Sequence, residues 1–337
     1  MYLITNTSYK INMKRNKWIL MITTMIFVCG MVFAVNSYKS SASSVGYFST
    51  YKDITSIQTS APYTSAQGMS IYGNKAYYIK TVNTSDHKSA SSQVWVYNLD
   101  TGAKKQVYNT DNKSYSFKIG HANSLYVDSK YMYIATQLKN EPSIYRLNVS
   151  CDNGKCYMGN LKKYKVYSSK TGDRKLMTVT GIEYANWMKG FLIKNGMKVY
   201  YGNFQGDEFV WTKSYDLHTN LTTTTKSGNE YIDFGNGKFI MQGMYYSKGI
   251  LYLPMTNANK MGQSIVVAYS LDSSVKSGAI LYPLTSRFFR ITSKMYKDLF
   301  EIEEVAYYGG RMYANVNAVD NSGKGSDRII RFNDFNY

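Results

Sequence analysis

The feature that most constrains the fold of this chain is an internal repeat of roughly sixty residues. The segments AQGMSIYGNKAYYIK, from Ala66, and MQGMYYSKGILYLPM, from Met241, both read Gln-Gly-Met, an apolar-rich strand, a short turn and a second strand. The segment GHANSLYVDSKYMYIA, from Gly120, has the same form with one extra residue in the turn. Looser copies begin at Thr180 and Glu303. Self-similarity at a regular period is typical of a repeat architecture, so this period decides the fold class.

A further strand of common character follows each of these hairpins. These third strands are expected at residues 93–100, 143–149, 209–217, 264–272 and 327–334. The first strands begin near residues 67, 121, 180, 242 and 303, which gives spacings of 54, 59, 62 and 61 residues. Five such units, each with three or four strands and polar turns, predict an all-β, five-bladed β-propeller. A β-sandwich is the competing fold, but it explains neither the long period nor the Gln-Gly-Met duplication.

The last unit ends after its third strand, so its fourth strand must come from another part of the chain. An open sheet edge invites aggregation. The segment GYFSTYKDITSI, residues 46–57, has no other assignment. We therefore predict that this N-terminal strand closes the last blade, and that residues 46–337 form a single propeller. The 34 tyrosines agree with this fold, because tyrosine favours half-buried, pleated strands.

The first 34 residues have a different character. The basic segment MKRNK, from Met13, precedes an uncharged apolar run over residues 18–34 that ends in Val-Phe-Ala. This pattern predicts a secretory signal peptide over residues 1–34, with Met13 as an alternative start, followed by a Ser-rich linker over residues 35–45. The alternative is an uncleaved membrane anchor, because 17 apolar residues are near the lower limit for a membrane span.

A secreted protein with this charge points to anionic partners. Without residues 1–34 the chain keeps 36 basic and 22 acidic residues, a net charge of +14. Outside the cell such a charge favours wall polymers or acidic glycans, unless it only keeps the surface soluble. The basic residues are scattered and form no Lys/Arg block, so we expect no nucleic-acid partner. A membrane contact is expected only through a retained signal peptide, as in a protein associated with the cell surface.

Two cysteines remain after the predicted signal peptide, in SCDNGKCYMG. Cys151 and Cys156 bracket a turn-forming Asp-Asn-Gly-Lys between two strand-like segments. In an oxidising compartment this spacing predicts a disulfide across the end of a hairpin. A metal site would need further Cys or His ligands nearby in the sequence, and none is present, so we predict neither a metal nor a cofactor.

The first strand of each propeller blade lines the central channel, and the repeat places a polar residue at the start of each of these strands. The aligned positions, together with two polar residues beside them, form a candidate ligand ring of Gln67, His121, Asn123, Thr180, Gln242, Glu303 and Glu304. The ring could hold a ligand or a cation. Alternatively, its members satisfy one another and the neighbouring backbone, because buried polar groups need partners.

Catalytic motifs are scarce in the sequence. It contains no Gly-x-Ser-x-Gly elbow, P-loop or HExxH motif. Glu183, Glu303 and Glu304 fall on expected inner strands, and a carboxylate pair there could act on a glycan. The sequence does not fix their separation, so we assign no catalytic residue. Trp187 and Trp211 could stack on sugar rings, or could pack within the blades.

The motifs also resemble a known family. Gly120-His121, the Gln-Gly-Met starts and the glutamate-rich EIEEVAYYGG segment are similar to those of helveticin J-like class III bacteriocins. More distantly, they resemble five-bladed propellers of teichoic-acid-associated proteins and phage receptor-binding proteins. This resemblance implies a five-bladed propeller and antibacterial activity, and it carries over no catalytic residue.

These observations lead to one main functional prediction and two alternatives. The main prediction is a secreted propeller that binds an anionic polymer or glycan of the bacterial cell envelope, with bacteriocin-like antibacterial activity and without enzymatic activity. The first alternative is a secreted glycan hydrolase or lyase that uses inner-strand glutamates. The second is a structural surface protein retained by residues 18–34.

Overall fold

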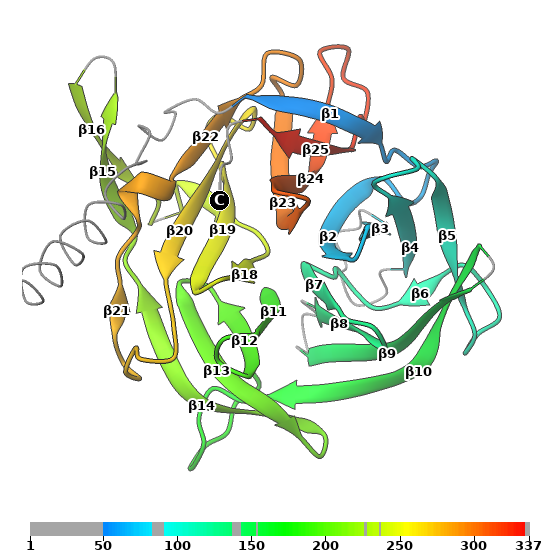
Figure 1. Cartoon of the computed structure of the whole chain (residues 1–337), viewed down its shortest axis with the longest axis horizontal. Coiled ribbons are helices and arrows are strands. Elements are labelled where there is room, and N and C mark those ends of the chain that lie inside the picture. The colour runs from blue at the N-terminus through cyan, green and yellow to red at the C-terminus, as the bar shows by residue number, and fades with distance from the viewer. Residues whose placement is uncertain are drawn as a thin grey trace, which may run out of the picture. The chain divides into compact units, whose positions relative to one another are not determined.

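The computed structural model describes residues 50–82, 91–136, 143–152, 154–225, 228–235 and 237–333. Over these residues the strands form five antiparallel blades around a central axis (Figure 1), which confirms the predicted five-bladed β-propeller. In the described part of the chain, no helix combines the length and apolar character needed to cross a membrane. The predicted signal peptide and linker lie outside the described residues.

Blades 1 and 2 each contain four strands whose spatial order follows their order in the chain. Blade 1 consists of β2 (Ser65–Tyr72), β3 (Lys75–Thr81), β4 (Ser91–Asn98) and β5 (Lys104–Asn109), and β6 (Phe117–Lys118) pairs with β4. Blade 2 consists of β7 (Ser124–Val127), β8 (Tyr131–Thr136), β9 (Ser143–Asp152) and β10 (Lys155–Val166). The third strands β4 and β9 lie where the repeat predicts them.

The structure of blade 3 corrects the prediction of one strand. It consists of β11 (Gly181–Ala185), β12 (Gly190–Asn195), β13 (Lys198–Gln205) and β14 (Glu208–Leu217). The prediction that residues 209–217 form the third strand was wrong, because they belong to β14, the fourth strand. A two-residue turn at Gly196, whose φ is +55°, joins β12 to β13. The third strand therefore begins sooner after the second than it does in blade 1. The residues at the distance expected from the repeat belong to the fourth strand instead.

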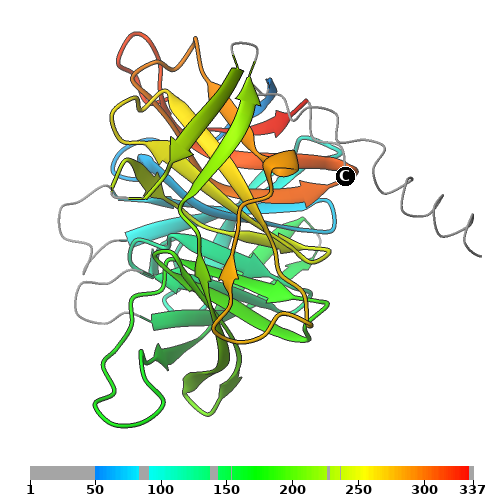
Figure 2. The ribbon, with the colours of Figure 1, turned by 90° about the vertical axis from the view of Figure 1, so that its left-hand side faces the viewer.

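Blade 4 has an interrupted inner strand. Its strands are β17 (Phe239–Met241) and β18 (Tyr245–Ser247), which both pair with β19 (Ile250–Asn257), then β20 (Gln263–Ser270) and β22 (Phe289–Thr292). Between β20 and β22 lie β21 (Ile280–Leu281), which pairs with β14 of blade 3, and the short 3-10 helix η1 (Thr285–Arg287). A separate hairpin, β15 (Asn220–Thr225) and β16 (Gly228–Asp233), precedes the blade. Figures 1 and 2 show this hairpin, in yellow-green, at the edge of the ring of blades.

Blade 5 is completed by the N-terminal strand. It consists of β23 (Leu299–Tyr308), β24 (Arg311–Val319), β25 (Arg328–Phe332) and β1 (Tyr51–Ser56), which pairs antiparallel with β25. The Arg328 guanidinium also contacts the Asp53 carboxylate of β1 at 2.9 Å. The predicted closure of the ring by residues from the 46–57 segment is therefore confirmed.

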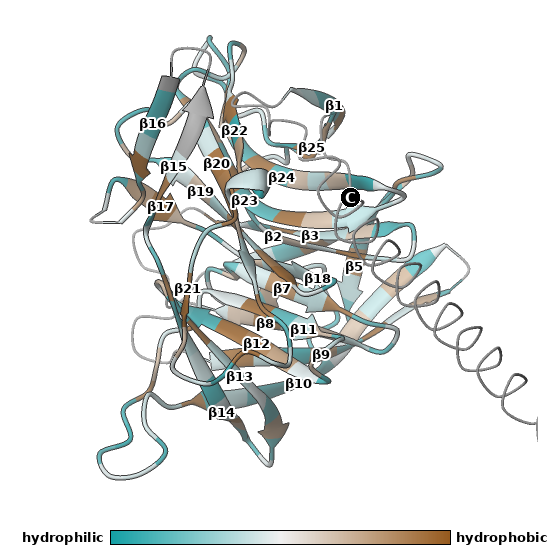
Figure 3. Ribbon diagram, turned by 60° about the vertical axis from the view of Figure 1, so that its left-hand side comes forward, coloured by the Kyte–Doolittle hydropathy of each residue, from teal (hydrophilic) through white to brown (hydrophobic). Residues whose placement is uncertain are grey.

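The hydrophobic core is divided into five clusters, and each lies between two neighbouring blades. Leu192 of blade 3 and Val267 of blade 4, for example, belong to one cluster, and Ile79 of blade 1 and Leu125 of blade 2 belong to another. Hydrophobic bands run along the blade strands (Figure 3). Each blade is thus stabilised by burial against its two neighbours, as in other repeat folds.

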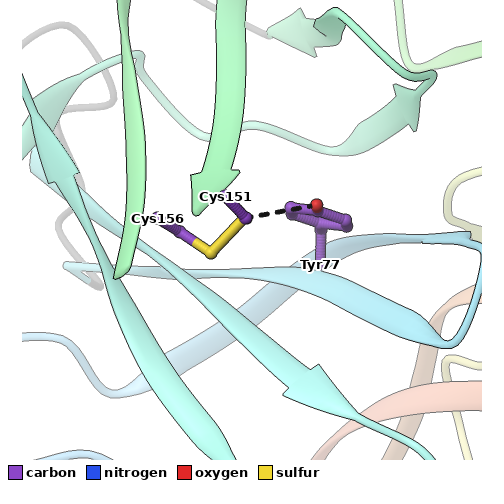
Figure 4. Close-up of a disulfide and its surroundings, with 3 residues drawn as sticks. All are labelled: Tyr77, Cys151 and Cys156. Carbon is purple, nitrogen blue, oxygen red and sulfur yellow. Dashed lines mark hydrogen bonds between the residues drawn. A yellow bond between two sulfur atoms is a disulfide. The ribbon is translucent and has the colours of Figure 1, made fainter. Parts of the chain in front are cut away.

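The predicted disulfide is present at the end of the β9–β10 hairpin. Cys151 and Cys156 are bonded and face each other in the strand register. The Tyr77 hydroxyl of blade 1 lies 3.6 Å from the Cys151 sulfur (Figure 4). The disulfide therefore fixes the tip of a blade 2 hairpin against blade 1.

Candidate functional site

Three of the five inner strands are irregular where they approach the axis. β2 carries a bulge, and β23 carries another between Ile302 and Glu304. In blade 4, residues 242–244 separate β17 from β18. A bulge leaves a residue outside the ladder and re-aims the side chains beside it. The bulge in β23 explains how two successive glutamates, Glu303 and Glu304, are both buried near the axis.

Two glycines allow the inner strands to converge. A Cβ atom on Gly68 would lie 2.9 Å from the Ser124 Cα of the next blade, and one on Gly243 would overlap the Glu304 carboxyl group. Real Cβ atoms do not approach other atoms this closely, so any side chain at either position would displace a neighbour. The glutamate in blade 5 therefore packs directly on the backbone of blade 4.

Carboxyl groups dominate the region around the axis. Five of them are at most 9% exposed, namely Glu183, Glu301, Glu303, Glu304 and Asp327. Two buried lysines, Lys80 and Lys194, accompany them. An ionised group in a dry interior needs an opposite charge, or it changes its protonation state. Five carboxyl groups and two ammonium groups cannot all be charged there, so some of the carboxyl groups keep their protons.

Glu301 and Glu303 form a carboxyl pair. The Gln242 side-chain amide donates to one oxygen of Glu301, and the Asn317 amide donates to the other at 3.4 Å. Glu303 is within hydrogen-bonding reach of Glu301, and this contact stabilises the ionised form of Glu301. Glu301 thus accepts from two side-chain amides, and the neighbouring Glu303 also favours its ionised form.

Burial governs the pKa values of this pair. Burial raises the pKa of Glu303 well above its ordinary value, and the charges of Glu301 and Asp327 raise it further. Burial also raises the pKa of Glu301, but its hydrogen bonds from Gln242, Asn317 and Glu303 oppose the increase. Two neighbouring carboxyl groups whose environments separate their pKa values can divide acid and base roles.

A second group of charges surrounds Glu304. Burial raises the pKa of Glu304 well above its ordinary value, and the charge of Lys194 opposes this. The Ser124 hydroxyl and the Met244 backbone amide also favour the ionised form of Glu304. The Lys194 amino group donates to the Thr180 hydroxyl at 2.9 Å, and burial lowers the pKa of Lys194 to about 8. Burial also raises the pKa of Glu183, whose charge acts on Glu304.

A buried ion pair joins blade 5 to blade 1. The Lys80 amino group of β3 contacts the Asp327 carboxylate, which precedes β25. Asp327 also accepts from the backbone amides of Ala66 and Ala318, each at 2.9 Å. Burial lowers the pKa of Lys80 and raises that of Asp327, while their mutual attraction opposes both changes. This pair fixes the joint at which the ring closes.

The seven residues of the predicted ring occupy different levels in the structure. Gln67, Glu303 and Glu304 lie in the inner strands β2 and β23 and are buried. Thr180 and Gln242 are half-buried and contact Lys194 and Glu301, respectively. His121 and Asn123 precede β7, so they are not in an inner strand. Whether this ring binds a ligand stays a prediction.

The two predicted aromatic contacts lie elsewhere. Trp187 is 59% exposed in the turn between β11 and β12. Trp211 belongs to β14, the fourth strand of its blade, and its indole nitrogen donates to the Tyr167 carbonyl at 2.9 Å. The Lys170 amino group lies 4.6 Å from the centre of the Trp211 ring. The structure therefore does not bring either tryptophan to the carboxyl groups.

Sequence reasoning missed the two buried lysines and Asp327. Lys80 ends the apolar segment AYYIK, and Lys194 ends the equivalent segment GFLIK. A lysine at the same place in two apolar second strands was the available signal. No such signal marks Asp327, because the loop before β25 has no apolar pattern. Within the described ranges, no three His, Cys, Asp or Glu side chains form a group that could hold a metal ion.

Comparisons with known proteins show only remote likenesses. No protein-family model matches the chain, and no curated protein matches it. CoXyl43, a GH43 β-xylosidase/α-arabinofuranosidase from a compost microbial metagenome crystallised with xylotriose, is 10% identical with a TM-score of 0.46, over 84% of this chain and 95% of that chain. RS223 β-xylosidase is 11% identical with a TM-score of 0.45, over 84% and 94%. A GH43_1 enzyme from Xanthomonas citri in complex with xylotriose is 7% identical with a TM-score of 0.46, over 83% and 89%.

The main functional prediction is corrected by these findings. Carboxyl groups, not basic groups, dominate the axis, and such a site does not attract an anionic envelope polymer. The solved structures named above are glycoside hydrolases by name, and their likeness to this chain is one of fold alone. The prediction of an envelope-binding propeller with bacteriocin-like activity is therefore wrong. The resemblance to the helveticin J-like family stays a prediction.

Proposed function

We propose that the protein hydrolyses glycosidic bonds and that the Glu301–Glu303 pair supplies the acid. The observation that supports this proposal is the Glu301 carboxyl group, which accepts from Gln242 and Asn317, beside Glu303, whose pKa is raised well above its ordinary value by burial. A carboxylic acid whose pKa is raised by burial keeps its proton near neutral pH. This is the property required of the acid that protonates a leaving sugar oxygen.

The accessibility of the pair agrees with this role. Glu301 is the most exposed of the five axial carboxyl groups, at 9%. Its two amide partners, Gln242 and Asn317, are half-buried and so are partly in contact with solvent. Among Glu301, Glu303 and Glu304, Glu301 is thus the carboxyl group that is most open to a sugar. Glu301 is therefore the catalytic residue of the proposal, and Glu303 is a positioning residue that shares its proton.

The proposed step balances as a hydrolysis. The pair gives one proton to the glycosidic oxygen while the bond between that oxygen and the anomeric carbon breaks. Water adds its hydroxyl group to the anomeric carbon, and its remaining proton returns to the pair. In this proposal Glu301 and Glu303 act together as one acid, because each changes the pKa of the other.

Substitution of each glutamate by glutamine tests the proposal. We expect E301Q to lower kcat by about a hundredfold or more, because it removes the acid that protonates the leaving group. Xylo-oligosaccharides are the first substrates to assay, since xylotriose is the sugar bound in the complexes named above. The matched control is E208Q, which changes a glutamate of β14 that pairs with Arg174 far from the axis. Circular dichroism of each variant would establish that it is folded.

The pH profile separates the roles of the two glutamates. Repulsion between the two carboxylates makes the pair hold its last proton to a higher pH. E303Q removes this repulsion, so the alkaline limb of kcat/KM should move to lower pH. A merely structural role for Glu303 would leave the position of this limb unchanged. If folded E301Q and E208Q cleave glycans at the same rate, the proposal is wrong.

A further inference from the structure

A hollow lies outside the axis, next to the disulfide hairpin of blade 2. Its volume is about 560 Å³, and its walls include Lys105 and Tyr108 of β5, Tyr115 of the following loop, and Lys155 and Tyr157 of β10. We call this set of five residues the hairpin groove. A smaller hollow of about 270 Å³ adjoins it, shares both lysines and adds Lys75. The parallel pairing of β5 with β10 places the groove at the joint between blades 1 and 2.

Three tyrosines line the hairpin groove. The Tyr108 ring stands edge-on to Tyr115 at a centroid distance of 5.3 Å and to Tyr157 at 6.3 Å. Tyr115 is 52% exposed, so a molecule bound in the groove would bury part of its ring. Tyrosine rings present an apolar face with a polar tip, which suits the mixed surface of a sugar.

Basic side chains also line the groove. The residues that line the two hollows include Lys75, Lys105 and Lys155, and within the described part of the chain no acidic residue lines either hollow. The Lys105 amino group reaches over the hairpin tip, where a Cβ on Gly154 would collide with it. Asp152 stands opposite Lys155 in the hairpin but does not line the groove. Ammonium groups beside aromatic faces fit a sugar that carries a carboxylate.

A disulfide and two hydrogen bonds order the residues around the groove. The disulfide closes the hairpin, and the Tyr77 hydroxyl contacts its Cys151 sulfur (Figure 4). On the opposite side, the Asn109 amide donates to the Ser116 carbonyl at 2.8 Å and fixes the loop that carries Tyr115. A site ordered in advance loses less conformational entropy when it binds. The disulfide thus does more than stabilise the hairpin, because it also positions Lys155 and Tyr157 beside the groove.

We propose that the hairpin groove binds uronate-containing oligosaccharides at a site separate from the axis. The role of the hairpin groove rests on the proposed function, since this second site would hold a polymeric glycan while the Glu301–Glu303 pair cleaves it. The binding itself does not depend on that function. The proposal therefore names acidic glycans as the ligand class of the groove.

Calorimetry with the full chain tests this binding. The probes are an oligogalacturonate and a neutral xylo-oligosaccharide of the same length. We expect the uronate to bind, and Y115A and K155Q each to weaken its affinity at least tenfold. The matched controls are Y282A, which removes a tyrosine that is 62% exposed elsewhere, and K198Q, which removes a lysine beside Asp216. Equal affinity of Y115A and Y282A, equal affinity for both sugars, or no binding of the uronate would overturn the proposal.

The two proposals fail separately. E301Q should bind the uronate as the unmodified chain does, and Y115A should cleave a short substrate at the unmodified rate. Glycan cleavage without uronate binding would overturn only the proposal that the hairpin groove binds uronates. Uronate binding that Y115A weakens would support the groove even if no glycan is cleaved.

Discussion

At the level of single residues, burial decides which groups hold protons. The glutamates of β23 were visible in the sequence as candidates, but their roles were not. Those roles depend on the bulge beside Glu303 and on the amides of Gln242 and Asn317, which come from other strands. Lys80 could have been suspected from its apolar strand, whereas its partner Asp327 becomes evident only when the ring is closed.

The raised pKa of Glu303 makes stability depend on pH. The ordinary pKa of a glutamate is 4.5, and the folded state keeps this proton to a higher pH than the unfolded state does. The stabilisation is therefore complete below pH 4.5 and is lost as pH rises toward the folded pKa, by about 1.4 kcal/mol per pH unit for one proton. We expect E303Q to flatten the fall in unfolding free energy measured with urea from about pH 5 to 7. A slope in E303Q equal to that in E208Q would contradict this assignment.

The buried Lys80–Asp327 pair predicts a strong asymmetry between single and double substitutions. D327N leaves a buried ammonium group without its partner and should cost about 3–5 kcal/mol of unfolding free energy. The double variant K80M/D327N removes both charges and should recover much of this loss. The control is D53N at the half-exposed Arg328–Asp53 pair, which should cost less than about 1 kcal/mol. If D327N and D53N are equally stable, the pair does not fix the joint of the ring.

At the level of secondary structure, the repeat predicted most of the blades. It located the inner strands of blades 1, 3 and 5, whereas β7 begins later than predicted and the inner strand of blade 4 is interrupted. The strand left over at residues 46–57 predicted the closure by β1, because the period required a partner for β25. Blade 3 was misassigned since the tight turn at Gly196 shortened one connection. The β15–β16 hairpin was not predicted, because an insertion between two units leaves no trace in the repeat itself.

Removal of β1 tests the closure of the ring. A chain that begins at Gln58 lacks β1 and the buried Ile57, so β25 would present an unpaired edge. The lost burial of Ile57 alone should cost about 1.5–3 kcal/mol, and the open edge should promote aggregation. Thermal unfolding and light scattering would measure both effects against a chain that begins at Gly46. Equal melting temperatures and no aggregation would contradict the role of β1.

At the level of the whole molecule, net charge did not reveal the character of the axis. A charge of +14 sums groups over the entire surface, and it does not reveal that acidic side chains gather at the axis. The composition therefore favoured an anionic partner, whereas the site favours chemistry by carboxyl groups. The fold followed from the period, but the site required the strands to be placed in space.

The predicted export of the protein can be tested with the full chain, including residues 1–34. The basic segment and the apolar run before Val35 should direct secretion and then be removed. Expression of the full chain in an exporting bacterium should release a protein whose N-terminal residue is Val35. Mass spectrometry of the released protein would measure this end. A cell-associated chain that still contains residues 18–34 would indicate a membrane anchor instead.

The most direct test of the central proposal is glycan cleavage by the full chain in isotopically labelled water. Mass spectrometry would follow an oligosaccharide panel that includes xylotriose and an oligogalacturonate. The proposed hydrolysis predicts products that carry one labelled oxygen at the new reducing end, formed by the unmodified chain and by E208Q but not by E301Q. No product, unlabelled products, or equal product from E301Q would contradict hydrolysis by the Glu301–Glu303 pair.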